Sequence, residues 1–329
     1  MKSFVVDRSR FFLLLVAALA ALSVTAAAGA AGPRTCTTSC ATAFTPNPLG
    51  SPFGIARGPR GSMWFGQDDY LGQINRRGKL TMHFIRSGAG IGWVTVHPDS
   101  DVWFAERGTG MIGVFHANGS LREYALPSPD AVPQGIVFAP DGNIYVTEQG
   151  SNAIARLNPV TGAAVDIPVP TPDATVQSGV LGPDGAIWFI ERSADKVGRM
   201  TLDGQFTEYQ LAPGSFPNRI VVGPDGALWF TELFSSMLGR ITTSGALTEY
   251  PVPGGPVGIT VGKDGQLYTA LFLAAGVARV NTSGQVTGMW TLPGAVGPLQ
   301  ITNGFGLDIW TPDAFGGNVY QLTPYATGR

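Results

Sequence analysis

Charged residues are scarce in this chain. They make up 13% of its 329 residues, roughly half the usual share of about 25%. The 21 Lys and Arg do not outnumber the 23 Asp and Glu, so the net charge is −2. The chain therefore has no excess of positive charge with which to bind a nucleic acid. Helical periodicity is also missing beyond the N-terminal segment. We therefore expect neither a nucleic-acid-binding protein nor a helical fold.

Cysteine is nearly absent as well. Cys36 and Cys40 are the two cysteines of the chain, four positions apart in a short N-terminal segment (32–42). In an oxidising compartment they can form one local disulfide, but they can equally stay free or pair between chains. Zinc is a weak interpretation, because a zinc site needs four ligands and no histidine lies nearby. The predicted disulfide is Cys36–Cys40, with the other two states open.

One long apolar run is present, and it lies at the N-terminus. Three positive charges precede 12 apolar residues (11–22), and small residues follow over 25–32. This pattern is typical of a secretory signal peptide cleaved near residues 28–31. The alternative, a membrane anchor, would need about 20 apolar residues to cross the bilayer. We expect a signal peptide over 1–31, a secreted extracellular protein and no membrane span after cleavage.

Glycine and proline, in contrast, are abundant. The 45 Gly and 25 Pro accompany a 44% share of hydrophobic residues, which suits a turn-dense all-β fold. An aromatic residue recurs every 39 to 43 positions, usually just after a turn of the Pro-Asp-Gly type. Each repeat of about 40 residues contains four short strands, the signature of a propeller blade, whereas a solenoid would need polar caps that are not evident. The recurring aromatics are Trp64, Trp103, Tyr145, Trp188, Trp229, Tyr268 and Trp310.

The two ends of the repeat region predict how the ring closes. The seventh repeat has strand-like segments near 300–302, 308–310 and 318–322, with no clear fourth strand after them. Residues 43–46, before the first repeat, resemble that missing strand. We therefore predict an all-β, seven-bladed β-propeller over 43–329 with four-stranded blades. Its N-terminal strand completes the last blade, because a closed ring has no exposed sheet edges.

The repeat resembles that of the virginiamycin B lyase family. The resemblance is carried by Gly-Pro-Asp-Gly-Ala-Leu-Trp-Phe-Thr-Glu at 223–232, Leu-Gly-Arg-Ile-Thr at 238–242, Leu-Thr-Glu-Tyr-Pro-Val-Pro at 247–253 and Gly-Pro-Asp-Gly-Ala-Ile-Trp-Phe-Ile-Glu at 182–191. It covers about residues 43–322 and all seven repeats. The resemblance implies, as a candidate activity, opening of the ester-closed ring of streptogramin B antibiotics by elimination, with Mg²⁺ as a candidate cofactor.

The residues that the family uses in catalysis are not matched here. The resemblance places its two catalytic histidines in Pro-His-(Gly/Ala)-Ile motifs, where this chain has Val257 and Leu299. A family glutamate falls on Gly297, and the nearest acid to a second one is Asp313. None of the seven equivalent positions is a histidine, so the catalytic residues are unknown. These positions are Phe53, Gly92, Gln134, Gln177, Asn218, Val257 and Leu299.

The three histidines of the chain lie elsewhere in the repeats. We expect His83 in a fourth strand, His97 just before a turn and His116 at the end of a third strand, on the outside or bottom of the blades. Without an imidazole at the channel, a general base near pH 7 would have to be a perturbed carboxylate or another group.

The residue three positions after the recurring aromatic is acidic in five of the seven repeats. Strand one starts and strand two ends on the same face of a propeller, so these residues should surround one mouth of the channel. Glu148, Glu191 and Glu232 are candidate ligands of a hard cation such as Mg²⁺. The alternative is structural, with each glutamate paired to the arginine of a neighbouring strand or accepting hydrogen bonds from backbone N–H groups. The residues at this position are Gln67, Glu106, Glu148, Glu191, Glu232, Leu271 and Asp313, and the arginines are Arg156, Arg199, Arg240 and Arg279.

The mouth is predicted to be polar on one side and apolar on the other. Such a surface suits an amphipathic small molecule or peptide, although the apolar residues could simply plug the channel. Two hypotheses follow for a monomeric protein: a ligand-binding or interaction propeller, or a divergent metal-assisted lyase or lactone-cleaving hydrolase. The candidate ligand-binding residues are Phe53, Trp93, Gln134, Gln177, Asn218, Val257 and Leu299.

Overall fold

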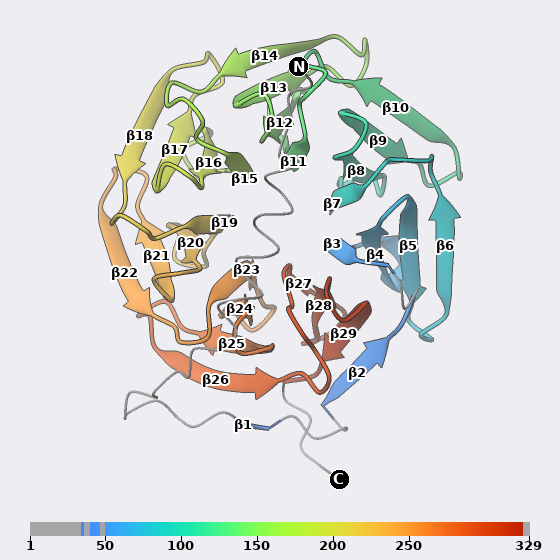
Figure 1. Ribbon diagram of the computed structural model, residues 1–329, viewed down its shortest axis with the longest axis vertical. Helices are drawn as coiled ribbons and strands as arrows, with labels where there is room; N and C mark the ends of the chain where they lie inside the picture. The colour runs from blue at the N-terminus through green and yellow to red at the C-terminus, as the bar shows by residue number, and fades with distance from the viewer. Residues whose placement is uncertain (1–33, 36–39, 47–49, 325–329) are drawn as a thin grey trace, which may run out of the picture. The chain divides into compact units, whose positions relative to one another are not determined.

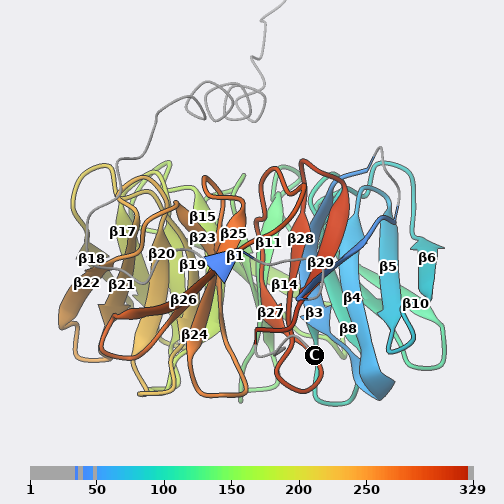
Figure 2. The ribbon, with the colours of Figure 1, turned by 90° about the horizontal axis from the view of Figure 1, so that it is seen from below.

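The structure is a computed structural model that describes residues 34–35, 40–46 and 50–324. Within these residues the strands form seven sheets around a common centre (Figure 1). Seen from the side, the strands run between two opposite faces (Figure 2). The predicted seven-bladed β-propeller is confirmed. The described residues contain one short 3₁₀ turn, η1 (Pro59–Gly61), and no helix long and apolar enough to cross a membrane.

Each blade places its strands in the same order from the centre outwards. The innermost strands are β3 (Pro52–Arg57), β7 (Ile91–Val96), β11 (Pro133–Phe138), β15 (Val176–Leu181), β19 (Pro217–Val222), β23 (Pro256–Val261) and β27 (Thr302–Asn303). The second strands are β4 (Ser62–Gln67), β8 (Val102–Glu106), β12 (Ile144–Glu148), β16 (Ile187–Glu191), β20 (Leu228–Glu232), β24 (Leu267–Leu271) and β28 (Ile309–Asp313).

The two outer positions complete each antiparallel blade. The third strands are β5 (Tyr70–Asn75), β9 (Met111–Phe115), β13 (Ala153–Leu157), β17 (Lys196–Met200), β21 (Met237–Ile241), β25 (Gly276–Val280) and β29 (Asn318–Leu322). The fourth strands are β6 (Leu80–Phe84), β10 (Leu121–Ala125), β14 (Ala164–Pro168), β18 (Phe206–Gln210), β22 (Leu247–Pro251), β26 (Val286–Thr291) and β2 (Ala41–Phe44).

The N-terminal strand closes the ring as predicted. β2 pairs antiparallel with β29 as the fourth strand of the seventh blade, and Phe44 stacks on Trp310 with ring centroids 5.3 Å apart. A second N-terminal strand, β1 (Arg34–Thr35), pairs parallel with β26 and gives the sixth blade a fifth strand. β1 was not predicted from the sequence. Cys40 is disulfide-bonded. Cys36 and the proposed signal peptide lie outside the described residues.

The innermost strand of the seventh blade is shorter than predicted. A strand was expected near 300–302, but β27 spans Thr302–Asn303. The neighbouring Pro312 faces this strand, since its carbonyl accepts a hydrogen bond from the Leu299 N–H (3.2 Å). Pro312 has no N–H to donate in return, so the ladder is interrupted there.

Turn aspartates bind the second and third strands of a blade together. In the fifth blade, Asp225 accepts hydrogen bonds from Trp229 Nε1 (2.9 Å) and from Arg240 Nε (2.7 Å). Asp184 does the same for Trp188 and Arg199 in the fourth blade. In the sixth blade Asp264 binds Tyr268 and Arg279. The expectation that these repeat arginines pair with the glutamates of the mouth is therefore wrong, because the turn carboxylate lies beside them.

The hydrophobic core lies between neighbouring blades. One cluster joins Trp188 and Ile190 of the fourth blade to Ile220 and Phe230 of the fifth. Phe230 is fully buried and sits in register with Gly239 on the adjacent strand. A Cβ atom added to Gly239 would lie 2.0 Å from Phe230 Cζ, so this glycine provides the space for the ring.

Replacing Gly239 with alanine is expected to destabilise the protein by about 1–3 kcal/mol, because the buried Phe230 ring must move. The third blade has the smaller pair Val146 and Ala155 at the same register position. Adding Phe230→Val should therefore restore part of the loss caused by Gly239→Ala. Urea unfolding of both single variants and of the double variant measures this coupling. If the changes in unfolding free energy of the two single variants add up to that of the double variant, the two positions are independent.

Candidate functional site

The central channel is built from the innermost strands, and most of them are irregular where they enter it. In all but the last blade, the pairing of the innermost with the second strand shifts register between its first and fourth residues. A bulge of this kind bends a strand and redirects its side chains. The bulged pairs are Phe53 and Gly54, Gly92 and Trp93, Gln134 and Gly135, Gln177 and Ser178, Asn218 and Arg219, and Val257 and Gly258.

Buried threonines satisfy the backbone groups that the bulges release. Thr147 Oγ1 accepts a hydrogen bond from the Gly135 N–H (2.7 Å). Thr231 Oγ1 accepts one from the Arg219 N–H (3.1 Å) and donates to the Val257 carbonyl of the next blade (2.8 Å). The irregular backbone is thus anchored both within a blade and between blades, and the side chains at the mouth have a rigid support.

Amide side chains form an ordered network on one side of the mouth. Gln149 Oε1 accepts hydrogen bonds from Gln134 Nε2 (2.9 Å) and from Gln177 Nε2 (3.0 Å). Gln177 Oε1 in turn accepts one from Arg192 Nη2 (2.8 Å). Two of these four residues, Gln149 and Arg192, were missed by the sequence analysis. Both directly follow the acidic position at the end of a second strand, and this spacing was a usable signal.

Apolar side chains occupy the other side. Val257 and Leu271 are buried, and Phe272 meets Phe315 edge to face with ring centroids 5.7 Å apart. Leu299 donates its N–H to the seventh blade's second strand. The expected division into a polar and an apolar half is therefore present in the arrangement of the side chains, while their role in ligand binding stays a prediction.

A cavity of about 370 Å³ lies in the channel. Trp93 and Arg219 both line it, and they come from β7 and β19, on opposite sides of the centre (Figure 1). The guanidinium carbon of Arg219 lies 4.4 Å from the centre of a Trp93 ring, which is a cation–π contact. Trp93 was predicted to be a bulky residue at the channel. Arg219 was missed, although it occupies the same position of its repeat.

Two further arginines stack on aromatic rings. Arg107 Cζ lies 5.3 Å from the Phe53 ring, and Arg192 Cζ lies 5.3 Å from the Phe216 ring. Gly92 leaves room for the first of them, because a Cβ on Gly92 would lie 2.3 Å from Arg107 Cδ. Small residues at the mouth thus determine where the guanidinium groups can lie.

The three arginines act on one another electrostatically. Burial, helped by the charge of Arg107, lowers the pKa of Arg192 to about 9. Burial also lowers the pKa of Arg219 well below its ordinary value, and the charges of Arg192 and Arg107 act in the same direction. Within the described part of the chain, Nε of Arg107 and both Nε and Nη1 of Arg219 are buried without a hydrogen-bond partner. The positive charges of these three arginines therefore act on one another in a region from which solvent is largely excluded.

The sequence matches the model of the virginiamycin B lyase family over residues 9–174 and 85–327. The chain belongs to the virginiamycin B lyase family.

A search of curated proteins found no match. A solved streptogramin B lyase is 28% identical, with a TM-score of 0.80, 86% of this chain covered and 98% of that one. A catalytically inactive histidine-to-alanine variant of virginiamycin B lyase from Staphylococcus aureus, solved with quinupristin, is 31% identical with the same TM-score and coverages. Hydrazine synthase from Kuenenia stuttgartiensis, at 17% identity, TM-score 0.71 and coverages of 86% and 97%, shares the fold alone.

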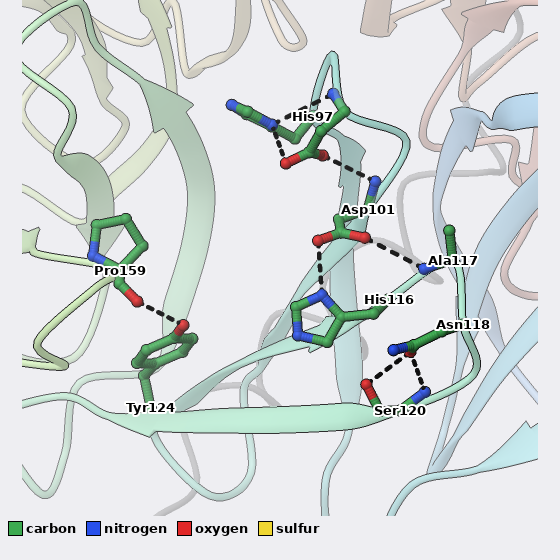
Figure 3. Close-up of polar contacts among 9 residues, drawn as sticks. His97, Asp101, His116, Ala117, Asn118, Ser120, Tyr124 and Pro159 are labelled. Carbon is green, nitrogen blue, oxygen red and sulfur yellow. Dashed lines mark hydrogen bonds and ion pairs between the residues drawn. The ribbon is translucent and has the colours of Figure 1, made fainter.

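In this member of the virginiamycin B lyase family, the histidines lie away from the channel mouth. His97 and His116 follow β7 and β9 at the opposite face of the second blade (Figure 3). His116 Nδ1 lies 2.6 Å from Asp101 Oδ2, and His97 Nδ1 lies 2.9 Å from a carboxylate oxygen of Asp99. His83, on the outer strand β6, stacks on Trp64 with ring centroids 5.5 Å apart.

The acidic residues of the predicted ring are buried, but they do not converge. Two of the carboxylates are bound within their own blades, since Glu148 accepts from the Ser151 hydroxyl and Glu232 accepts from the Ser235 hydroxyl (2.9 Å). Both carboxylate oxygens of Glu191 are buried without a hydrogen-bond partner in the described part of the chain. Burial raises the pKa of Glu148 and of Glu191 to about 7. Among residues 34–35, 40–46 and 50–324, no group of three or more His, Cys, Asp or Glu is arranged to hold a metal ion. The structure thus does not bring Glu148, Glu191 and Glu232 together.

Proposed function

We propose that this propeller is a secreted ligand-binding member of the virginiamycin B lyase family that does not catalyse the lyase reaction. The observation that carries the proposal is the composition of the channel mouth: an ordered amide network faces apolar side chains, and the three histidines lie elsewhere. The resemblance places the family's catalytic histidines at Val257 and Leu299, neither of which can exchange a proton.

The ligand that fits this mouth is an amphipathic small molecule or peptide. Gln134, Gln149 and Gln177 provide fixed polar groups on one side, while Val257 and Phe272 provide an apolar wall on the other. The channel also holds a cavity of about 370 Å³, lined by other residues such as Trp93 and Arg219, and its volume lies within the usual size of small-molecule sites, roughly 300–1,000 Å³. Binding sites of this kind combine apolar walls with a few oriented polar groups.

One observation favours an enzyme as the second candidate. A carboxyl group with a pKa near 7 is suited to general acid–base catalysis, and burial gives Glu148 such a pKa. This supports a divergent metal-assisted lyase or a lactone-cleaving hydrolase. Glu148 is, however, fully buried and bonded to Ser151, so a substrate would reach it only after a rearrangement of the mouth.

The purified mature protein is expected to leave quinupristin intact, with or without millimolar Mg²⁺. Chromatography follows the reaction, because elimination leaves the mass of the product unchanged whereas hydrolysis adds one water. The Staphylococcus aureus lyase serves as the positive control. Mg²⁺-dependent conversion that is lost in Glu148→Gln would instead establish the second candidate.

A thermal-shift screen of amphipathic small molecules and peptides tests binding itself. We expect Gln149→Leu to weaken any hit by at least about tenfold, because an apolar residue of similar size removes the centre of the amide network. Gln210→Leu, an exposed change on the outer strand β18, is the matched control and should bind like the wild type. Equal affinities of the two variants would place the ligand outside the mouth.

A further inference from the structure

The channel cavity presents hydrogen-bond donors that lack acceptors. Arg219 and Gln300 both line it, and their side chains are 5% and 6% exposed. In the described part of the chain, Arg219 Nε and Nη1 and Gln300 Nε2 have no hydrogen-bond partner. Burial of an unpaired guanidinium is unfavourable, because the group loses its hydration without gaining a counter-ion.

The stacked aromatic rings do not neutralise this charge. Arg219 Cζ lies 4.4 Å from the centre of a Trp93 ring, and Cζ of Arg107 and Cζ of Arg192 lie 5.3 Å from the Phe53 and Phe216 rings. A cation–π contact supplies no hydrogen-bond acceptor in the plane of the guanidinium group, and Nε and Nη1 of Arg219 have no partner among the described residues. These in-plane donors are the ones that bind a carboxylate or a phosphate in a bidentate manner.

Arg219 also breaks the symmetry of the repeat. The corresponding residues of the other blades carry no positive charge: they are Gly54, Trp93, Gly135, Ser178, Gly258 and Gln300. A small residue is required at some of them, since a Cβ on Gly54 would lie 2.1 Å from the Gly92 carbonyl oxygen and one on Gly258 would lie 2.6 Å from that of Leu299. A requirement of the architecture would recur in every blade, so a single buried arginine points to a ligand.

We propose that the central channel binds an anionic group at Arg219, and that this group is the carboxylate of an otherwise apolar molecule. The inference rests on the proposed function and deepens it by naming the charge of the ligand. Apolar side chains surround Arg219 in the cavity, among them Ile136, Ile220, Ile259 and Ile301. Such walls fit a hydrocarbon body, and they would leave the other charges of a polyanion without partners.

Arg107 and Arg192 extend this positive field at the mouth. Their charges act on Arg219, and both groups stay fixed on aromatic rings. An approaching anion is attracted by the sum of the three charges before it reaches Arg219. The bound carboxylate would then be the acceptor that Arg219 and Gln300 lack.

The experiment uses the mature protein in a buffer of low anion content and compares hexanoate with its neutral analogue hexanamide. We expect hexanoate to raise the thermal unfolding midpoint and to bind at least about tenfold more tightly than hexanamide in calorimetry. Arg219→Met should abolish the effect of hexanoate. Arg156→Met, an exposed change on the third strand of another blade, should leave it intact.

A second variant covers the case in which Arg219→Met does not fold. Gln300→Leu removes the other unpaired donor of the cavity and should weaken hexanoate binding several-fold. Equal binding of hexanoate and hexanamide by the wild type, or unchanged hexanoate binding by either variant, would overturn the proposal. Chloride or inorganic phosphate binding as tightly as hexanoate would also overturn it, since the site would then recognise a free inorganic anion.

The outcome separates this inference from the proposed function. If neutral amphipathic compounds bind at the mouth and hexanoate does not, the binding function stands and the anion site fails. If quinupristin is converted, the binding function fails, while the comparison of hexanoate with hexanamide still reports on Arg219.

Discussion

A chain that begins at residue 47 is expected to lose most of its resistance to urea and to self-associate. Removal of β2 leaves the seventh blade with three strands and exposes the edge of β29. It also takes away Phe44, which stacks on Trp310 in the core between the seventh and first blades. An open propeller with a bare edge strand can pair with a second copy. Urea unfolding and size-exclusion chromatography measure both effects.

The matched control is a chain that begins at Ala41, which keeps β2 but lacks β1 and both cysteines. It should elute like the chain that begins at residue 32 and stay close to it in stability. At the level of single residues, Phe44→Ala should cost about 2–3 kcal/mol of unfolding free energy, because the ring is half-buried. Thr42→Ala, on an exposed position of the same strand, should stay within about 0.5 kcal/mol. Equal unfolding midpoints for the chains starting at 41 and 47 would show that the ring holds without β2.

The protein is expected to be most stable between about pH 4 and pH 4.5 and to lose stability as the pH rises to 8. Burial raises the pKa of Glu106, Glu148 and Glu191 from 4.5 to about 7. The folded protein therefore holds these protons more tightly than the unfolded chain does. This contribution is complete below about pH 4.5 and is lost as the pH rises through about 7. Each group changes the free energy of unfolding by at most about 1.4 kcal/mol per pH unit, so three groups together amount to several kcal/mol.

The turn aspartates set the acidic limit of this optimum. Burial alone would raise the pKa of Asp184 and of Asp225, but hydrogen bonds from the neighbouring Arg and Trp side chains outweigh it and leave both pKa values below the ordinary 3.8. A lowered pKa contributes stability that is present above about pH 3.8 and is lost as the pH falls through the folded value. Stability therefore declines above about pH 4.5 and below about pH 3.8.

Urea unfolding from about pH 2.5 to about pH 8 measures this profile. Glu148→Gln should flatten its alkaline side, since glutamine keeps the position neutral at every pH, and the variant should gain on the wild type at pH 8 relative to pH 5. Asp130→Asn, at an exposed position, is the control and should follow the wild type. If the profile of Glu148→Gln runs parallel to that of the wild type, Glu148 does not titrate as its burial predicts.

Much of the architecture was predictable because its signals are local. The recurring aromatic, the turn before it and the alternation within each strand lie within about ten residues of one another. The missing fourth strand of the last repeat indicated the closing role of the N-terminal strand, and β2 confirms it. The effect of Pro312 on β27 was missed, because it depends on which side of the strand the proline nitrogen faces.

The candidate site was only partly predictable. Gln134, Gln177 and Trp93 were found because their repeat position was known, but Arg107 and Gln149 lie one residue beyond the position that was compared. The arginine partners of the glutamates were assigned wrongly, because a repeat pattern alone does not tell which of two nearby acids an arginine reaches. In the structure the arginine binds the turn aspartate instead, as the hydrogen bond from Arg240 Nε to Asp225 shows.

By itself, the sequence determined the blade, the number of blades and the strand that closes the ring. These properties follow from local turn chemistry and from period-two alternation, which one repeat already contains. Only the tertiary structure decided which side chains meet in the channel. Trp93 and Arg219 stand three blades apart and touch because seven twisted sheets, packed side by side, bring their innermost strands around one axis. The contact between Trp93 and Arg219 cannot be predicted from any short segment, because it depends on the closure of the whole ring.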